Sequence, residues 1–255
     1  MKMRSIGFVD YNLNGYHANT FCKLLQTELA GRGWRVSRCW AMDEVTGREW
    51  AAKWGVPYTS HLGDMHDCDG IMVLAPSNPE VHLELARQIL PLKIPTYIDK
   101  PFAPDLCTAR EIFNFADQHH TPVTTTSALR FCRSLQSQCL QTPFKAVRHM
   151  QAWGGGASFE EYAIHPLEMI ISIMGPEVTR VMKLGDGQHH QLQLEFSGNR
   201  TASAFVHTTG SCPFQAMITT EEATRFIDCS QDPIFQDLCS FVLDFFETRK
   251  EKRPA

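Results

Sequence analysis

A lysine at the end of an apolar segment is the first residue whose type and place could do chemistry. The segment YIDKPFA, residues 97–103, carries Asp99 and Lys100 directly before Pro101, which prevents a strand from continuing. Proline also biases Lys100 toward an extended conformation, which would hold its amine at the edge of a sheet. Ligands of open parallel sheets lie beyond the carboxyl ends of the strands, so this position favours a functional lysine. The alternative is a solvent-facing lysine paired with Asp99.

A histidine with acidic neighbours is the second candidate. In FEEYAIHPLE, residues 159–168, Glu161 lies four residues before His165, and Glu168 lies three residues after it. Residues at these spacings share one face of a helix. A carboxylate that bonds an imidazole fixes its tautomer and raises its basicity, which suits acid and base catalysis near neutral pH. The sequence predicts that this pair and Lys100 move a proton on and off a substrate oxygen; the alternative is a surface Glu/His pair.

The elements that must position these groups alternate between strand and helix in the first half of the chain. Short apolar runs predict strands, and segments with helical spacing of apolar residues lie between them. The expected strands are 4–10, 34–42, 69–76, 94–101 and 121–128, and the expected helices are 16–33, 44–55, 79–93 and 104–120. This order predicts an α/β Rossmann-like domain with a doubly wound parallel sheet over residues 1–124.

The second half of the chain changes character, because strands there follow one another through Gly and Asn turns. The expected helices are 130–140, 161–175 and a closing amphipathic helix over 233–255 with a basic end, and the expected strands are 144–153, 178–185, 190–198, 200–210 and 214–220. This pattern predicts an α+β domain over residues 125–255 with a mainly antiparallel, open-faced sheet.

Composition and charge exclude several classes of function. Hydrophobic residues make up 43% and charged residues 20%, as in ordinary soluble proteins, and a formal charge of -4 disfavours nucleic acid or an anionic membrane as partner. No apolar run reaches the ~20 residues of a membrane helix, and the start lacks a secretory signal, which predicts a cytoplasmic protein. The nine cysteines have no CxxC or CxxH spacing, so we expect reduced thiols and no metal site.

Together, the two candidate segments resemble the Gfo/Idh/MocA family of nicotinamide-dependent oxidoreductases, which includes glucose-fructose oxidoreductase and inositol dehydrogenases. In that family the fourth strand typically ends in Glu-Lys-Pro, matched here by Asp99, Lys100 and Pro101. The family's second-domain helix commonly carries an aspartate, three residues and a histidine, matched here by Glu161 and His165. The resemblance runs over about residues 5–175 and is that of a divergent, short member.

The resemblance implies a dinucleotide-binding Rossmann domain followed by a substrate domain. It implies an enzyme that transfers hydride between NAD or NADP and a small sugar- or polyol-like substrate, with homo-oligomers formed through the open sheet. It also implies that Lys100 orients the substrate, that His165 exchanges the substrate proton, and that Glu161 positions them. The implied cofactor contacts are Asn12, Gly15, Asp43, Ala75, Asn78 and Lys100.

The phosphate-binding loop departs from the family pattern. Its GxGxxG falls on DYNLNG, where Asp10 and Asn12 replace the first two glycines and Gly15 remains. A carboxylate ~4 Å from a phosphate oxygen is repelled by about 4 kcal/mol at an effective dielectric of 20, unless Asp10 points away or pairs with a cation. Asparagine tolerates positive φ, so Asn12 and Asn14 could preserve the shape of the turn. Asp43 either reaches a ribose hydroxyl or caps the next helix.

Three functions are therefore compared. The first is the NAD(P)-dependent oxidoreductase. The second is a non-catalytic relative that keeps the fold as a binding or regulatory protein and has lost nucleotide binding, which the replacements at Asp10 and Asn12 favour. The third uses Lys100 and His165 for elimination or hydrolysis instead of hydride transfer.

Overall fold

A five-stranded parallel sheet with strand order β2-β1-β3-β4-β5 forms the centre of the first of two units. The computed structural model describes residues 3–141, 144–185 and 189–249, and the first unit comprises residues up to 126 together with 235–249. Its strands are β1 (Arg4–Asp10), β2 (Trp34–Ala41), β3 (Gly70–Val73), β4 (Thr96–Ile98) and β5 (Val123–Thr124). All four strand pairs are parallel, which confirms the predicted Rossmann-like sheet.

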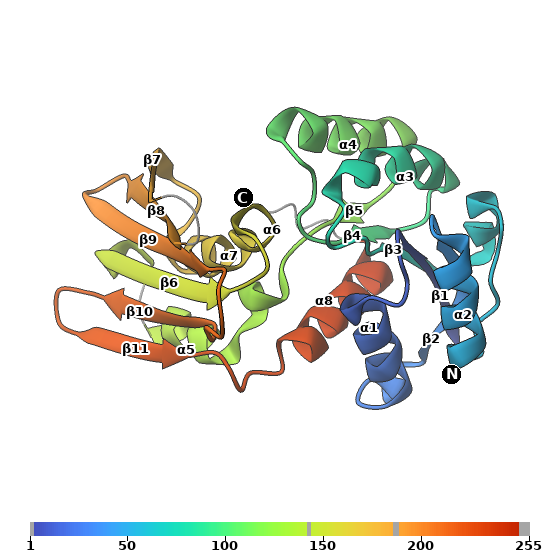
Figure 1. Cartoon of the computed structure of the whole chain (residues 1–255), viewed down its shortest axis with the longest axis horizontal. Coiled ribbons are helices and arrows are strands. Elements are labelled where there is room, and N and C mark those ends of the chain that lie inside the picture. The colour runs from blue at the N-terminus through green and yellow to red at the C-terminus, as the bar shows by residue number, and fades with distance from the viewer. Residues whose placement is uncertain (1–2, 142–143, 186–188, 250–255) are drawn as a thin grey trace. The chain divides into compact units, whose positions relative to one another are not determined.

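Helices cover both faces of this sheet because its strands are apolar on both sides. The helices are α1 (Tyr16–Gln26), α2 (Glu44–Trp54), α3 (His82–Ile89), α4 (Leu106–His119) and α8 (Ile234–Thr248), and the short 3-10 helices are η1 (Ala30–Arg32), η2 (Leu62–Asp67), η3 (Pro79–Val81) and η4 (Leu90–Leu92). On one face, the buried strand residues Val9, Ile71 and Ile98 form a core with Leu85 of α3 and Ile112 of α4. On the other face, the strands face α1, α2 and α8 (Figure 1).

The first helix ends earlier than the sequence predicts. We expected a helix to Gly33, whereas α1 ends at Gln26 and only a 3-10 turn follows. Thr27 explains the difference, because its hydroxyl donates to the Lys23 carbonyl at 2.7 Å and its N–H donates to the Leu24 carbonyl. A side chain that bonds the backbone in this way competes with regular helix geometry.

The second unit, residues 127–234, contains a six-stranded sheet with strand order β11-β10-β6-β9-β8-β7. Its strands are β6 (His149–Gly155), β7 (Val178–Leu184), β8 (His189–Phe196), β9 (Arg200–His207), β10 (Gln215–Thr219) and β11 (Thr224–Asp228). All pairs are antiparallel except β6 with β9, so the sheet is mixed and mostly antiparallel, as expected. The strand β11 is not predicted from the sequence, because this edge strand lacks a clear apolar alternation and exposes Phe226.

One face of this second sheet is covered and the other is open. The helices of the unit are α5 (Arg133–Gln141), α6 (Phe159–Tyr162) and α7 (Ile164–Met174), with the 3-10 helices η5 (Ala128–Phe131) and η6 (Phe144–Ala146). Met150 of β6 and Ala202 of β9 form a core with Met169 and Ile170 of α7, which lies beside β6 in Figure 1. We call the opposite surface the open face. It carries the alternate residues His149, Gln151 and Trp153 of β6, Thr201, Ser203, Phe205 and His207 of β9, Gln215, Met217 and Thr219 of β10, and Phe226 of β11.

The C-terminal helix packs with the first unit, whereas the predicted partition at 124/125 placed it with the second. In Figure 1, α8 (red) runs beside α1 (dark blue), and the Phe235 ring lies 5.2 Å from that of Tyr16. Polar contacts also hold it to this unit; for example, Arg32 pairs with Asp244, and Trp34 Nε1 donates to Glu247. The sequence showed the amphipathic face of this helix but not which sheet it covers. The basic end predicted over 250–255 lies outside the described residues.

Among the described residues, no helix combines the length and apolar character that crossing a bilayer requires. Eight of the cysteines are described as free thiols, six of them buried, which agrees with the expectation of reduced cysteines.

Candidate functional site

Asp10 ends β1 at the switch point of the parallel sheet, between β1 and β3, where ligands of such folds bind. Its side chain is turned inward: the residue is 2% exposed, and Oδ1 accepts from the N–H of Ala75 at 2.9 Å and of Asn12 at 3.3 Å. Oδ2 is buried without a hydrogen-bond partner among the described residues. Burial, helped by the nearby charge of Asp99, raises the pKa of Asp10 to about 7. A carboxyl in this state is largely uncharged below neutral pH.

The loop after β1 does not adopt the left-handed turn that a glycine loop uses. Asn12 and Asn14 are absent from the described residues with positive φ, and Gly15 has φ −63. Instead, Asn12 Oδ1 accepts from the Asn14 N–H at 2.9 Å, and the Asn12 carbonyl accepts from the Gly15 N–H at 3.2 Å. The proposed role of the asparagines is therefore corrected, because an Asx turn replaces positive φ. Among the residues that the structure describes, no side chain caps α1 at Gly15.

Asp99 is fully buried after β4 and is surrounded by donors. It accepts from the Tyr97 hydroxyl and the Lys100 N–H, both at 2.8 Å, and it pairs with the Nδ1 atom of His17. Burial alone would raise the pKa of Asp99, but His17 and the neighbouring positive charge of Lys100 keep it below its usual range. Asp99 is therefore ionised at pH values below 7, at which the carboxyl of Asp10 is still largely protonated.

Lys100 is only 7% exposed. This excludes the alternative of a solvent-facing lysine, because a charged ammonium is rarely buried without a specific use or a close partner. Its backbone is held by Asp99, and the peptide bond that follows, to Pro101, is cis. The structure thus places a buried cation at the carboxyl end of β4, as the position before Pro101 predicted.

His17 lies in the first turn of α1 and is not among the site residues that the sequence predicts. Its ring packs edge-on against Phe21 at 6.1 Å and Phe235 at 5.1 Å, which fixes its orientation toward Asp99. The only signal was a histidine two residues after Gly15, and nothing local indicates a partner 82 positions away.

The remaining residues predicted to contact the cofactor have other visible bonds. Asp43 caps α2 and accepts from the N–H groups of Val45 at 3.1 Å and Thr46 at 3.3 Å. Of the two alternatives for Asp43, a ribose contact or a helix cap, the structure shows the cap. Ala75 has φ 32 and uses its N–H for Asp10. Asn78 donates to the Glu80 carboxylate at 2.9 Å. Their roles in binding a nucleotide remain predictions.

His165 of the second unit is buried between two rings and a hydroxyl. Its Nδ1 lies 3.0 Å from Ser127 Oγ, and the rings of Tyr162 and Phe214 lie 5.6 and 5.2 Å away. Ser127 is also held, because its Oγ accepts from the Leu129 N–H at 3.3 Å. The imidazole is thus oriented by a serine that the sequence analysis had placed in a strand.

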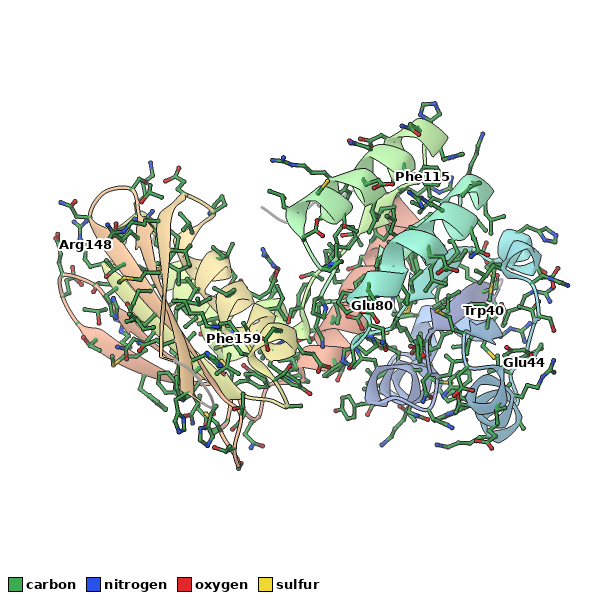
Figure 2. All side chains as sticks on the ribbon, turned by 45° about the horizontal axis from the view of Figure 1, so that its top comes forward. Trp40, Glu44, Glu80, Phe115, Arg148 and Phe159 are labelled. Carbon is green, nitrogen blue, oxygen red and sulfur yellow. The ribbon has the colours of Figure 1, made fainter. Side chains whose placement is uncertain are left out.

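The GGG run before α6 makes room for these rings. A Cβ added at Gly156 would lie 1.9 Å from the Tyr162 ring, and one at Gly154 would lie 2.1 Å from the Phe214 ring. Both distances are far below contact distance, so these glycines serve close packing around His165 and not a flexible turn. Phe159, labelled in Figure 2, begins α6, and its ring lies 4.8 Å from the tilted ring of His190.

The acidic neighbours of His165 have different surroundings. The N–H of Glu161 is capped by Ser158 Oγ at 3.2 Å, which places Glu161 in the first turn of α6. Glu168 is nearly buried and binds Arg130 Nε at 2.6 Å, so this pair anchors α7 to η5.

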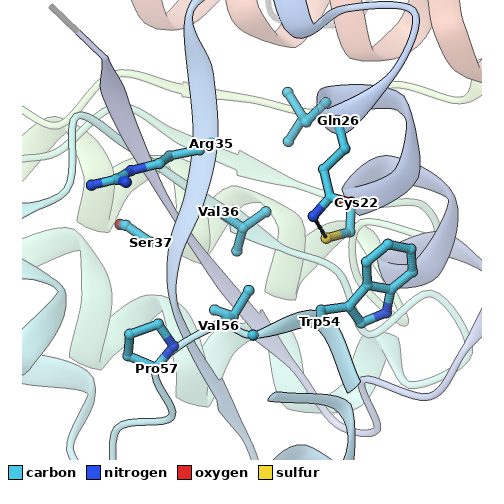
Figure 3. A pocket seen from close by; sticks show the side chains of 10 residues that line it. Cys22, Gln26, Arg35, Val36, Ser37, Trp54, Val56 and Pro57 are labelled. Carbon is cyan, nitrogen blue, oxygen red and sulfur yellow. Dashed lines mark hydrogen bonds between the residues drawn. The ribbon is translucent and has the colours of Figure 1, made fainter. Parts of the chain in front are cut away.

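A cavity of about 410 Å³ lies beside the edge strand β2 (Figure 3). It is lined by Cys22 and Gln26 of α1, by Val36 of β2 and by Trp54 and Val56. Burial raises the pKa of the Cys22 thiol to about 12, so it stays protonated and unreactive at neutral pH. The cavity lies near the start of β2, away from the carboxyl ends of the strands, and contains none of the candidate site residues.

Comparison with known proteins gives a family for part of the chain. Residues 15–127 match the Gfo/Idh/MocA model, described as an oxidoreductase family with an NAD-binding Rossmann fold. No curated protein matches the sequence.

Several solved structures share the fold over nearly the whole chain. UDP-N-acetylglucosamine 3-dehydrogenase GnnA from Acidithiobacillus ferrooxidans is 13% identical with a TM-score of 0.82, covering 98% of this chain and 91% of its own. Apo scyllo-inositol dehydrogenase from Lactobacillus casei is 14% identical with a TM-score of 0.81, covering 98% and 90%. GenD2 from gentamicin A biosynthesis, solved in complex with NAD, is 14% identical with a TM-score of 0.76, covering 89% and 73%. At these identities the likeness establishes the fold alone.

Proposed function

We propose that this chain, whose Rossmann domain belongs to the Gfo/Idh/MocA oxidoreductase family, transfers a hydride between NAD or NADP and a small hydroxylated or carbonyl substrate. The observation that carries the proposal is Lys100, a buried cation held by Asp99 at the carboxyl end of β4. The similar folds include dehydrogenases named for a sugar nucleotide and an inositol, which supports a sugar- or polyol-like substrate. The sequence also predicts a cytoplasmic protein that binds neither nucleic acid nor membrane.

Lys100 has the properties needed to act on a substrate oxygen. Its ammonium can donate to a hydroxyl or carbonyl oxygen, and the ionised Asp99 behind it stabilises the positive charge. His17 and Tyr97 hold Asp99, so they act as positioning residues for the lysine. The nicotinamide, when bound, supplies the hydride acceptor or donor.

His165 would accept or return the proton of the substrate hydroxyl. The bond to Ser127 and the two flanking rings restrict the imidazole to one orientation, which favours proton transfer because little reorganisation is needed. We assign Glu161 to positioning, as the family resemblance implies.

The first unit also fits a dinucleotide in two respects. The N–H groups in the first turn of α1 have no capping side chain in the described part of the chain, which suits a pyrophosphate. The carboxyl of Asp10 is turned into the protein and its pKa is raised to about 7, which reduces the expected repulsion of phosphate. Asn12, Gly15, Asp43, Ala75, Asn78 and Lys100 remain the proposed contacts.

The experiment that tests the proposal is a calorimetric titration of the full chain with NAD, NADH, NADP and NADPH at pH 6.5. We expect at least one of them to bind with a Kd below ~1 mM, and the bound form to be reduced or oxidised by a polyol or sugar from a panel. A chain that binds none of the four at millimolar concentration contradicts the proposal.

The alternative is a non-catalytic relative that has lost nucleotide binding. The observation that favours it is the loop after β1, which lacks positive φ and replaces two glycines. This alternative predicts an intact fold and no heat of binding with any of the four nucleotides, so the same titration separates the two.

We also propose that the protein forms homo-oligomers through the open face. The central strands β6, β9 and β10 present no Lys, Arg, Asp or Glu on this face, and they carry Trp153, Phe205 and Met217 there. Depletion of charge together with aromatic residues and methionine is typical of the core of an interface. Trp153 is half-buried on this surface beside Phe226.

Replacing Phe226 by glutamate is expected to convert oligomers into monomers. Phe226 is 61% exposed, so the change should leave the fold intact while placing a charge in the proposed interface. Analytical ultracentrifugation checks this, with Val45→Glu as the matched control, since Val45 is 68% exposed on α2 of the first unit. A wild-type protein that sediments as a monomer contradicts the proposal.

A further inference from the structure

Two thiols and a carboxylate meet in the second unit, and none of them is among the candidate site residues named so far. Cys132 lies between η5 and α5, Cys229 follows β11, and Asp232 lies in the turn before α8. Their sulfur atoms and a carboxylate oxygen all lie within 4.8 Å of one another. Three potential metal ligands from two distant parts of the chain are thereby brought together.

The surroundings hold these groups in place. Cys132 and Cys229 are buried as free thiols within the apolar core of the unit. Asp232 accepts from the Ser134 N–H at 2.9 Å and from its hydroxyl at 3.0 Å, and the Asp232 N–H donates to the Cys229 carbonyl at 3.3 Å. Hydrogen bonds of this kind orient a ligating carboxylate from outside the metal shell.

We propose that Cys132, Cys229 and Asp232 form a binding site for a zinc ion. Thiolates select zinc over calcium or magnesium, which prefer oxygen ligands. Tetrahedral zinc with bonds of about 2.3 Å to sulfur and about 2.0–2.2 Å to oxygen requires donor atoms ~3.5–3.8 Å apart. The observed spacing is close enough for small side-chain adjustments to reach this geometry. Asp232 is only partly buried, so water can supply the fourth ligand.

The protonation of the thiols indicates how binding would proceed. The contact with Cys229, together with burial, raises the pKa of the Cys132 thiol above its ordinary value. Zinc binds the thiolate form of cysteine, so metal binding must release the proton of each thiol that becomes a ligand. Binding should strengthen as pH rises. A bound ion would tie the segment before α5 to the turn before α8, which stabilises the unit.

The sequence could not indicate this site. Cys132 and Cys229 are far apart in the chain, and neither belongs to a CxxC or CxxH pair. The expectation of no metal site was based on that spacing. The site is also independent of the proposed oxidoreductase activity, since it shares no residue with it.

The test is a titration of the full chain, reduced and treated with a chelator, with cobalt(II) and then zinc. We expect one equivalent of cobalt to give the near-ultraviolet charge-transfer absorption of thiolate ligands, zinc to displace it, and the Tm to rise by ~5 °C or more. Cys132→Ser and Cys229→Ser should abolish the absorption. Cys239→Ser is the matched control, because Cys239 is also buried but lies outside the site.

Asp232→Asn is a second test, which remains informative even if the cysteine variants fail to fold. Its amide oxygen can still accept from the Ser134 N–H, yet it is a poor ligand, so we expect cobalt affinity to fall by at least ~10-fold with an unchanged fold. Wild-type protein without thiolate absorption at one equivalent overturns the proposal. It is equally overturned if the absorption persists in the Cys132→Ser, Cys229→Ser double variant, or if air alone oxidises the two thiols to a disulfide while the reduced protein binds no cobalt.

Discussion

Replacing Lys100 by methionine is expected to lower turnover by about 10²–10⁴-fold while the protein still binds nucleotide. Methionine keeps an unbranched side chain in the buried position but removes the ammonium that would donate to the substrate oxygen. Loss of one hydrogen bond to the nucleotide should weaken binding by no more than ~10-fold. The measurements are steady-state kinetics, with the polyol or sugar that the wild type turns over fastest, and calorimetric titration with the nucleotide.

Two controls separate chemistry from stability in this experiment. Lys23→Met alters an exposed lysine of α1 and should leave turnover unchanged. Lys100→Arg keeps a positive charge beside Asp99, so it should preserve the fold while turnover still falls, because a guanidinium is bulkier and holds its donors in a rigid planar fork. A Lys100→Met variant with wild-type turnover would show that the lysine has no part in the reaction.

Replacing Asp10 by asparagine is expected to change how stability depends on pH. The pKa of this carboxyl is about 7 in the folded protein, against 3.8 as the ordinary value. Between these values the folded state binds a proton that the unfolded state has released, so wild-type stability falls as pH rises from about 4 to about 7. At about 1.4 kcal/mol per pH unit, the full cost of the ionised carboxyl at pH 8 is on the order of 4 kcal/mol. Asparagine does not ionise and avoids this loss.

The measurement is urea unfolding of both proteins at pH 4.5 and pH 8. We expect the free energy of unfolding of the variant, relative to wild type, to be higher at pH 8 than at pH 4.5 by a few kcal/mol. The comparison between the two proteins removes the contribution of other groups, such as Asp99. A difference that is the same at both pH values would contradict the raised pKa.

The same residue should affect nucleotide binding. The charged form of Asp10, which appears above pH 7, should weaken binding of a phosphate nearby, so wild-type affinity for NADH should fall between pH 6 and pH 8. The Asp10→Asn variant should show a smaller fall. Calorimetric titration at the two pH values checks this expectation.

Much of the fold follows from the sequence alone, because local patterns specify it. Strands such as β1 and β3 are short runs of apolar residues, and a run buried on both faces is the mark of a parallel sheet. Where the local pattern is weak, as in β11 with its exposed Phe226, the prediction failed. The helix α1 ended early because a single threonine hydroxyl competes with the backbone, which hydrophobic periodicity does not register.

The candidate site also has features that follow from the sequence and features that only the tertiary structure decides. The sequence determined that Lys100 would lie at the carboxyl end of a strand, since Pro101 follows it, and that His165 would begin a helix. Only the tertiary structure showed that His17 and Tyr97 hold Asp99, that Ser127 orients His165, and that the carboxyl of Asp10 turns inward. Burial and partners far along the chain decide a side chain's direction and its charge, because desolvation and hydrogen bonding depend on what the folded chain brings near.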